Sequence, residues 1–405
     1  MLYNRTSLSL ATAWCINQLA YSIVYPFIPG YLNATRGIPM ETVGLIFPAM
    51  GAAAIVGPPI AGWLTDRLGR RFVLQFGQTI RTVVFLTLAG LAFWEAPFWA
   101  FLVALVFNTF FGSFFGIAAD AYLADMTTEA ERPMFYSNIR IGYNIGWALG
   151  PAAGSFLAGV PFWAMFLVTA VLCQACAFYT SHICKAPAKG SGRSNKGLEW
   201  RSLAKLFMDA ELTTLLLGAF ILYLLVSQLY STMSIYATGV MGIGRHPLGL
   251  VYSLNGFLII LLQVPITLLM DKLQARQYLR LVLGCVLYAT GYFAIGLAGG
   301  AWSLAVCVSI LTGGELLVQP ALYTILTHCS PPGLTGVTMA SSGLMRGIGY
   351  AVGPWFGAQA CALWSDIPLL LWGSQAIFAV IAAAIFTLGF LLAQRRLKSS
   401  TKVLH

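Results

Sequence analysis

Long apolar runs separated by short polar breaks recur from one end of the sequence to the other. Most of these runs are about 20 residues or longer, the length that an α-helix needs to cross the hydrocarbon core of a bilayer. Their apolar positions are continuous rather than alternating, which favours helices over the strands of a membrane β-barrel. The runs predict twelve membrane-spanning helices, at about 8–31, 42–64, 73–94, 97–123, 136–159, 162–184, 211–238, 247–270, 279–299, 301–327, 335–363 and 368–393.

The only long hydrophilic stretch separates the sixth predicted helix from the seventh, and it is rich in Lys, Gly and Ser. The expected fold class is therefore an all-α integral membrane protein with two pseudo-symmetric six-helix bundles. The predicted parts are a bundle over 1–184, a cytoplasmic linker over 185–210, a second bundle over 211–394 and a cytoplasmic tail over 395–405.

The composition excludes ordinary soluble domains. Of the 405 residues, 59% are hydrophobic and only 9% are charged, whereas soluble domains carry about a quarter of charged residues. The net charge of +10 is explained by its distribution, because Lys and Arg are retained on the cytoplasmic side. With a cytoplasmic amino terminus, eighteen of the 23 basic residues fall inside and only Arg36 and Arg245 fall outside. We expect both termini in the cytoplasm, a bacterial inner membrane, and no nucleic-acid partner.

An internal repeat supports the division into halves. The fifth predicted helix carries Gly146, Gly150, Pro151 and Gly154, and the eleventh carries the same residue types at the same spacing. In the eleventh helix these are Gly349, Gly353, Pro354 and Gly357. Recurrence at the same ordinal position in each half indicates gene duplication.

The junction of the second and third predicted helices carries a motif, Gly62-Trp-Leu-Thr-Asp66-Arg67-Leu-Gly69-Arg70-Arg71. It resembles the loop signature G-x-L-x-D-R-x-G-R-R of the major facilitator superfamily. The resemblance covers the whole chain and implies two six-helix bundles that rock about a central cavity, which opens alternately to each side of the membrane.

The resemblance also implies that this loop is a gating latch. Asp66 is expected against the positive amino-terminal end of the eleventh helix. The loop arginines are expected to pair with an acid at the end of the fourth helix, for which Asp125, near Arg132, is the candidate. The second half carries only a degraded copy, Met270-Asp271-Lys272-Leu273, so the first copy is expected to latch more strongly.

The glycine and proline run of the fifth helix resembles the signature of the drug-proton antiporters in that superfamily, G-x8-G-x3-G-P-x2-G-G. Ser137 and Ser155 replace two of its glycines. A generic packing seam between helices is the alternative interpretation. Many of those antiporters carry an Arg in the fourth helix where this chain has Asn108, four residues before Gly112. Proton coupling through that arginine therefore does not carry over.

Ionisable residues within membrane helices are costly and mark candidate functional positions. Five qualify: Arg81, Asp120, Arg140, Glu315 and Arg346. Asp120 and Arg140 are predicted close enough to pair, either as a static brace or for coupling. Glu315 is the first choice for the proton carrier and Asp120 the second, because a poorly solvated carboxylate favours its protonated form. Arg346 would pair with Glu315 or hold an anionic group of the substrate.

Amide and aromatic side chains are candidates for lining the cavity, although helix-to-helix hydrogen bonds explain each one singly. They are Asn17, Gln18, Tyr21, Tyr25, Asn108, Tyr143, Asn144, Gln228, Asn255, Gln263 and Gln319. The eight cysteines lie mostly in apolar runs and the four histidines are scattered. No metal site, cofactor or enzymatic activity is expected, and the proton gradient would supply the energy.

These features predict a monomeric secondary transporter that exports small amphiphilic molecules in exchange for protons. A dedicated exporter of one metabolite, such as a siderophore or other anionic product, and a proton-coupled importer of a nutrient are the alternatives with the same fold. Outside the transporter class, a transport-dead receptor and a membrane-embedded enzyme remain.

Overall fold

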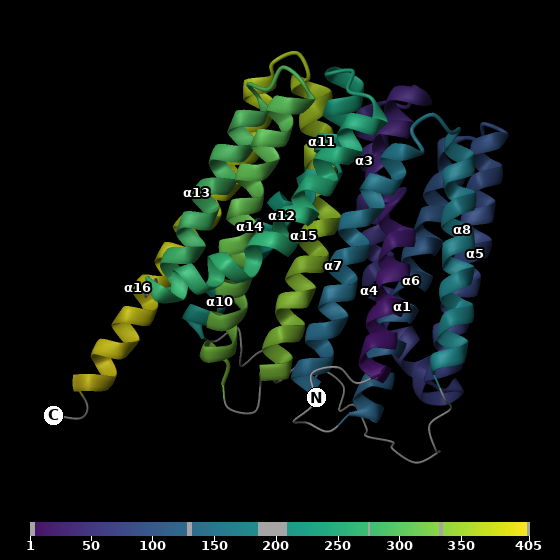
Figure 1. Ribbon diagram of the computed structural model, residues 1–405. Helices are drawn as coiled ribbons and strands as arrows, with labels where there is room; N and C mark the ends of the chain where they lie inside the picture. Colours follow the sequence, from purple (N-terminus) through teal and green to yellow (C-terminus); the bar gives the residue numbers. More distant parts are fainter. Residues whose placement is uncertain (1–4, 128–131, 185–208, 274–275, 332–334, 403–405) are drawn as a thin grey trace. The chain divides into compact units, whose positions relative to one another are not determined.

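The computed structural model describes residues 5–127, 132–184, 209–273, 276–331 and 335–402 (Figure 1). The six helical segments of the first half follow the predicted order. They are α1 (Arg5–Ser22), continued by α2 (Ile28–Gly30); α3 (Met40–Gly44) with α4 (Ile46–Leu68); α5 (Arg70–Phe93); α6 (Phe98–Met126); α7 (Arg132–Phe156); and α8 (Phe162–Ile183).

The second half repeats this order. Its segments are α10 (Ala210–Val226), continued by α11 (Thr232–Ile235); α12 (Arg245–Lys272); α13 (Gln277–Ile295); α14 (Ala301–Cys329); α15 (Thr335–Trp364); and α16 (Pro368–Lys402). The last helix runs to Lys402, through most of the segment predicted as a tail. The predicted linker lies almost wholly outside the described residues.

By length and composition, nine of the described helical segments are apolar enough to cross a membrane. The three predicted spans outside that set are the ones built on α1, α7 and α15. Two of them, α7 and α15, carry the glycine and proline runs, and α1 carries Asn17 and Gln18. Each of the three helices outside the set of nine therefore carries packing glycines or buried amide side chains.

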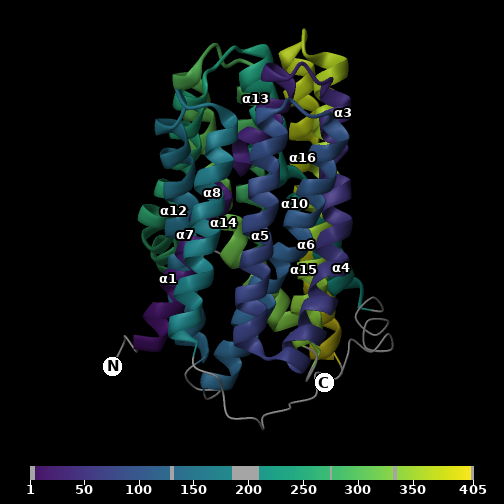
Figure 2. The ribbon, with the colours of Figure 1, turned by 90° about the vertical axis from the view of Figure 1, so that its right-hand side faces the viewer.

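The helix pairings of the two halves correspond. In the first half α1 packs on α7 and α8, and α5 packs on α6 and α8, as Figure 2 shows for α5 and α8. In the second half α10 packs on α15 and α16, and α13 packs on α14 and α16. The predicted repeat is thus present as a repeated set of helix contacts.

The first helix of each half is interrupted in the same way. After α1 the chain forms a 3₁₀ turn at Tyr25–Phe27 and a π-helical turn at Tyr31–Thr35. After α10 it forms a 3₁₀ turn at Ser227–Tyr230 and a π-helical turn at Tyr236–Val240. Pro26 in the 3₁₀ turn and Pro29 in α2 have no amide hydrogen to donate, which explains the break in the first half. The second half makes the same break without proline.

The glycines of the repeat form two equivalent seams. On α7, a side-chain carbon at Gly146 or Gly150 would collide with the backbone or side chains of α1, and Ser22 Oγ donates to the Gly146 carbonyl at 3.0 Å. On α15, a carbon at Gly353 would collide with α10, and Gln228 Nε2 donates to the Gly353 carbonyl at 2.8 Å. Both helices run on through Pro151 and Pro354. The glycines therefore allow close helix approach in both halves.

By contacts the chain divides into two compact units. The first comprises Met1–Arg193 with Ser234–Phe257, and the second comprises Ser194–Met233 with Leu258–His405. Residues 234–257 belong to the second half of the sequence, yet they pack with the first unit.

Candidate functional site

Arg81 is the centre of a buried polar cluster in the first unit. Its side chain comes from α5 and is 3% exposed. Nη1 donates to Asn17 Oδ1 at 2.7 Å and to Gln78 Oε1 at 3.3 Å, and Nε donates to Asn108 Oδ1 at 3.1 Å. Gln78 Nε2 also donates to Asn17 Oδ1, at 2.6 Å. Helices α1, α5 and α6 thus meet at one guanidinium.

Within the described part of the chain, the hydrogen-bond acceptors of the Arg81 guanidinium are all neutral. Among the described residues, no carboxylate oxygen lies within 4 Å of this guanidinium. The three acceptors are amide side chains, which satisfy hydrogen bonds but carry no compensating charge. A charge in this position costs about 3 kcal/mol on insertion scales. We will refer to Arg81, Asn17, Gln78 and Asn108 as the Arg81 cluster.

On α6, Asn108, Gly112, Gly116 and Asp120 recur every four residues and form one stripe of polar and small residues along the helix. Gly112 lies against the Arg81 side chain and Gly116 against the Trp14 ring. Asp120, at the end of the same stripe, is exposed in the first unit. Arg140 on α7 is also exposed, and no ion pair joins it to Asp120 in the described structure. A static brace between these two residues is therefore not formed here.

Aromatic rings extend from the Arg81 cluster along α1 and α7. Tyr21 stacks on Tyr25, with ring centroids 4.4 Å apart, and also stacks on Trp147 at 5.9 Å. Trp14 lies 6.0 Å from the Tyr143 ring. Tyr143 is 38% exposed, and Tyr21, Tyr25 and Trp147 are half-buried. We refer to Trp14, Tyr21, Tyr25, Tyr143 and Trp147 as the aromatic face of the first unit.

The second unit has a corresponding polar chain. Arg346 on α15 donates to the Tyr323 hydroxyl at 3.4 Å, and that hydroxyl lies 3.4 Å from the hydroxyl of Tyr223. Tyr223 in turn donates to Gln319 Oε1 at 3.3 Å. The repeat places Arg346 three residues before Gly349, as Tyr143 stands three residues before Gly146. Arg346 is exposed and Glu315 half-buried in this unit.

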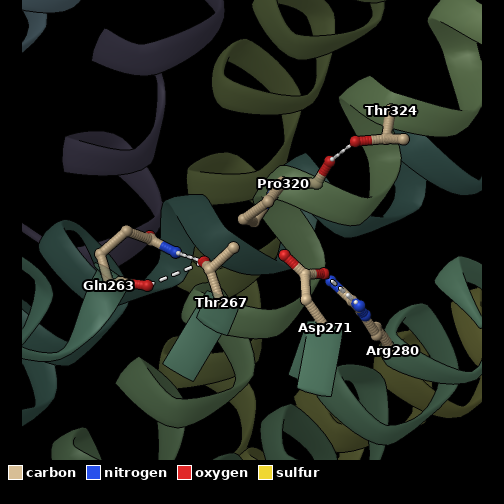
Figure 3. Close-up of polar contacts among 6 residues, drawn as sticks. All are labelled: Gln263, Thr267, Asp271, Arg280, Pro320 and Thr324. Atoms are coloured by element: carbon tan, nitrogen blue, oxygen red, sulfur yellow. Dashed lines mark hydrogen bonds and ion pairs between the residues drawn. The ribbon is translucent and has the colours of Figure 1, made fainter. Parts of the chain in front are cut away.

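Gln263 has a structural role next to Glu315. Pro320 has no amide hydrogen, so it leaves the carbonyl of Leu316, four residues earlier in α14, without its helical donor. Gln263 Nε2 donates to that carbonyl at 3.2 Å and to Thr267 Oγ1 at 3.3 Å. Figure 3 shows Gln263 and Thr267 together on α12, with Pro320 and Thr324 on α14. This contact joins α12 to α14 at the turn that follows Glu315.

The other predicted amides lie in packed positions. Gln18, Gln228 and Asn255 are buried. Gln18 lies against Gly146, and Gln228 accepts a hydrogen bond from Thr232 in the seam with α15. Asn144 is half-buried on α7. For Gln18 and Gln228, contact between helices explains the polar side chain.

The loop between α4 and α5 forms the expected ion pair. Arg70 Nε lies 2.8 Å from Asp125 Oδ2, and Arg70 Nη1 lies 3.4 Å from Asp66 Oδ1. Asp125 is 14% exposed in its side chain and Asp66 is 65% exposed. Gly69 separates the two helices with φ +90° and ψ 153°, a backbone conformation that favours glycine.

The remaining loop residues are more exposed. Arg67 stacks over the Trp63 ring, with its guanidinium carbon 4.4 Å from the ring centroid. Arg71 is exposed, and a side-chain carbon at Gly62 would meet Ile117 at 3.9 Å, an ordinary contact distance. The side chain of Arg132 lies outside the described part of the structure. Contact of Asp66 with the start of α15 stays a prediction.

The degraded second copy of the loop also holds an ion pair. Arg280 Nη2 on α13 lies 2.7 Å from Asp271 Oδ1 near the end of α12, as Figure 3 shows. Arg280 is 7% exposed in its side chain. Asp271 thus corresponds to Asp66 of the first half. Its partner Arg280 lies further along the chain from it than Arg70 lies from Asp66.

Comparison with known proteins identifies the family. The model of the Major Facilitator Superfamily matches residues 10–354. The chain belongs to the major facilitator superfamily. Its fold is therefore that of a multi-pass membrane transporter, as the loop motif predicts.

Characterised and uncharacterised members of the superfamily resemble the chain at low identity. An uncharacterized MFS-type transporter of Bacillus subtilis, YqjV, is 26% identical over 84% of the chain and 82% of its own length. The multidrug resistance protein MdtH of Escherichia coli is 23% identical over 93% of the chain and 92% of its own length. The solved structure of the nucleoside transporter NupG covers 96% of the chain and 99% of its own length, with a TM-score of 0.79 at 14% identity.

Several contacts of this superfamily member go beyond those that its sequence predicts. Gln78 stands three residues before Arg81, a spacing that places both on one helix face, so its part in the cluster was open to prediction. The Tyr223 and Tyr323 hydroxyls joined to Arg346 had no such signal, because they come from separate helices.

Proposed function

We propose that this transporter exports small amphiphilic organic molecules in exchange for protons. The observation that carries the proposal is the aromatic face of Trp14, Tyr21, Tyr25, Tyr143 and Trp147 beside the Arg81 cluster. Stacked rings provide broad apolar contact, while a few polar groups fix the orientation of a ligand. The likeness to MdtH, a multidrug resistance protein, supports export at the level of the family.

A second candidate function is export of one anionic product. The Arg81 cluster favours this function, because the guanidinium donates to three neutral amide oxygens. An anionic ligand would supply the counterion. Arginine binds carboxylate and phosphate groups through paired hydrogen bonds. The two candidates differ in breadth of substrate rather than in mechanism.

We assign proton coupling to Glu315 first and to Asp120 second. Glu315 is half-buried, next to the turn of α14 that Pro320 interrupts and Gln263 restores. Asp120 is exposed near the end of α6 and makes no ion pair among the described residues. Neither carboxylate is fully buried in its own unit, so each can exchange a proton with its surroundings. We also propose cytoplasmic termini and a monomer.

Dye accumulation in inside-out membrane vesicles tests the coupling. Vesicles acidified inside are expected to accumulate a fluorescent amphiphilic dye, and a protonophore is expected to abolish the uptake. Glu315→Gln is expected to reduce proton-driven uptake at least about tenfold, the size of effect that removal of an essential acid or base produces. Asp120→Asn is expected to have a smaller effect.

Gln263→Leu is the matched control, because it removes a neighbouring polar contact without removing a carboxylate. If Glu315→Gln and Asp120→Asn both retain wild-type uptake, proton coupling through these carboxylates is wrong. Uptake of no dye by folded wild-type protein would instead exclude the broad substrate range.

A further inference from the structure

The only two basic residues predicted on the outer side of the membrane have matching surroundings. Arg36 Nη2 donates to the carbonyls of Glu95 and Ala96, at 2.7 and 3.0 Å, in the turn between α5 and α6. Arg245 Nη2 donates to the carbonyls of Ala158 and Val160, at 2.5 and 3.1 Å, in the turn between α7 and α8. Each arginine therefore caps the end of a helical hairpin of the first half.

Both arginines also lie over an aromatic ring. The guanidinium carbon of Arg36 is 5.6 Å from the Phe101 centroid, and that of Arg245 is 5.6 Å from the Phe162 centroid. Tyr31 stacks on Phe162, with centroids 4.0 Å apart and rings 10° from parallel, and meets Phe101 edge-on at 6.3 Å. The two cations and three rings form one continuous series.

The two arginines differ in what they connect. Arg36 joins two segments of the first half, whereas Arg245 begins α12 and belongs to the second half. His246 adds a contact of its Nδ1 with the Ser155 carbonyl at 3.2 Å. Arg245 thus fastens the second-half segment 234–257 to the carboxyl end of α7.

Glycines along this segment allow it to pack closely on the first half. A side-chain carbon at Gly249 would meet Ser155 and, at 2.6 Å, the Pro151 carbonyl oxygen. One at Gly256 would meet the Ala148 Cα at 2.7 Å, and one at Gly239 would meet Asn33 Oδ1 at 2.5 Å. Glycine at these three positions therefore lets the backbone of this segment approach the first half closely.

We propose that Arg245 is a clasp that holds the outer side of the transporter closed and is released in each transport cycle. The clasp comprises Arg245, the Phe162 ring and the carbonyls of Ala158 and Val160. Charge-assisted hydrogen bonds to these carbonyls favour the closed seam, and the seam opens when α12 withdraws the guanidinium from them. Arg36 makes the same kind of contacts without joining the halves, so its role is to brace the first half alone. This proposal rests on the proposed cytoplasmic termini, which put the seam on the outer side, and it depends neither on the substrate nor on proton coupling.

Labelling of a reporter cysteine tests the clasp. Ser155 is fully buried beneath Gly249, so Ser155→Cys reports opening of the seam to a membrane-impermeant maleimide added to intact cells. In this background Arg245→Gln is expected to raise the labelling rate about tenfold, as loss of one strong hydrogen-bonded contact does to an equilibrium. Arg36→Gln is the matched control and is expected to leave the rate within about twofold, since it removes no contact between the halves.

Gly249→Val is the positive control for opening of the seam. It wedges the seam open by a different route and is expected to raise labelling whether or not Arg245 is the clasp. Labelling that rises with Gly249→Val but not with Arg245→Gln would overturn the proposal, and so would an equal rise with Arg36→Gln. Protein without the reporter cysteine gives the background from the native thiols.

Discussion

Arg81→Met is expected to weaken binding of an anionic aromatic probe about ten- to a hundredfold, because a hydrogen bond to a charged group contributes about 1.5–3 kcal/mol. The probe is a fluorescent naphthalene sulfonate, and the matching sulfonamide has the same rings without the charge. Binding of the sulfonamide is expected to change less than about threefold. The measurement is equilibrium binding to the purified protein in detergent.

The physical reason is the absence of a counterion among the residues of the Arg81 cluster. Asn17, Gln78 and Asn108 hold the guanidinium in place, but they leave its charge uncompensated. An anion that reaches this guanidinium pairs with its positive charge and accepts hydrogen bonds from its planar set of N–H donors. Arg81→Lys is expected to bind the sulfonate more tightly than Arg81→Met does, because it keeps the positive charge. It is expected to bind more weakly than the wild type, because lysine lacks the forked guanidinium that donates to Asn17 and Asn108 together.

Arg140→Met is the matched control, since Arg140 is an arginine of the same unit that is exposed rather than enclosed by amides. Equal affinity of wild type and Arg81→Met for the sulfonate would show that Arg81 is a structural cation. It would leave the proposed transport of amphiphiles untouched. Thermal unfolding is measured in parallel, because Asn108 loses its donor in Arg81→Met.

Asp125→Asn is expected to destabilise the protein by about 1–3 kcal/mol, because it leaves the partly buried charge of Arg70 without its close partner. Asp66→Asn is expected to change stability little, although Asp66 lies near the same arginine. The difference follows from exposure, since the Asp125 side chain is 14% exposed and that of Asp66 is 65% exposed. Thermal unfolding of the purified variants in one detergent measures both.

A double variant separates charge from packing at this loop. Arg70→Gln in the Asp125→Asn protein removes the unpaired charge and is expected to recover part of the lost stability. Failure of the double variant to recover any stability would mean that the charge of Arg70 is not the cause. Transport by Asp66→Asn is measured separately. If Asp66 contacts the start of α15 as predicted, this variant loses transport without losing stability.

The helical architecture was predictable because its signals are local. Apolar runs of membrane length, the repeated Gly146 and Gly349 patterns and the loop from Gly62 to Arg71 lie in continuous sequence. The pair of Arg70 with Asp125 was also predictable, since the family resemblance names the kind of acid and its helix. The structure confirms that pair.

The rest of the site depends on contacts between distant segments. Arg81 was recognisable as an ionisable group in a membrane helix, but its amide partners on α1 and α6 depend on the rotation of those helices about their axes, which the sequence does not specify. The contacts of Arg245 with Ala158 and Val160 join the two halves of the sequence. They depend on how residues 234–257 pack, which no local pattern encodes. Asp120 and Arg140 show the reverse case, in which compatible charges on neighbouring helices do not pair here.

Transport by the purified protein in liposomes is the direct test of proton-coupled export. Liposomes that contain the transporter are loaded with the naphthalene sulfonate or the sulfonamide, a pH gradient is imposed, and probe flux and internal pH are followed together. A proton-coupled exporter is expected to move at least one probe against its gradient with proton movement in the opposite direction, and Glu315→Gln is expected to abolish the coupling. Probe movement that is independent of the pH gradient, or no movement of either probe by folded protein, would show that the protein is not a proton-coupled exporter of such molecules.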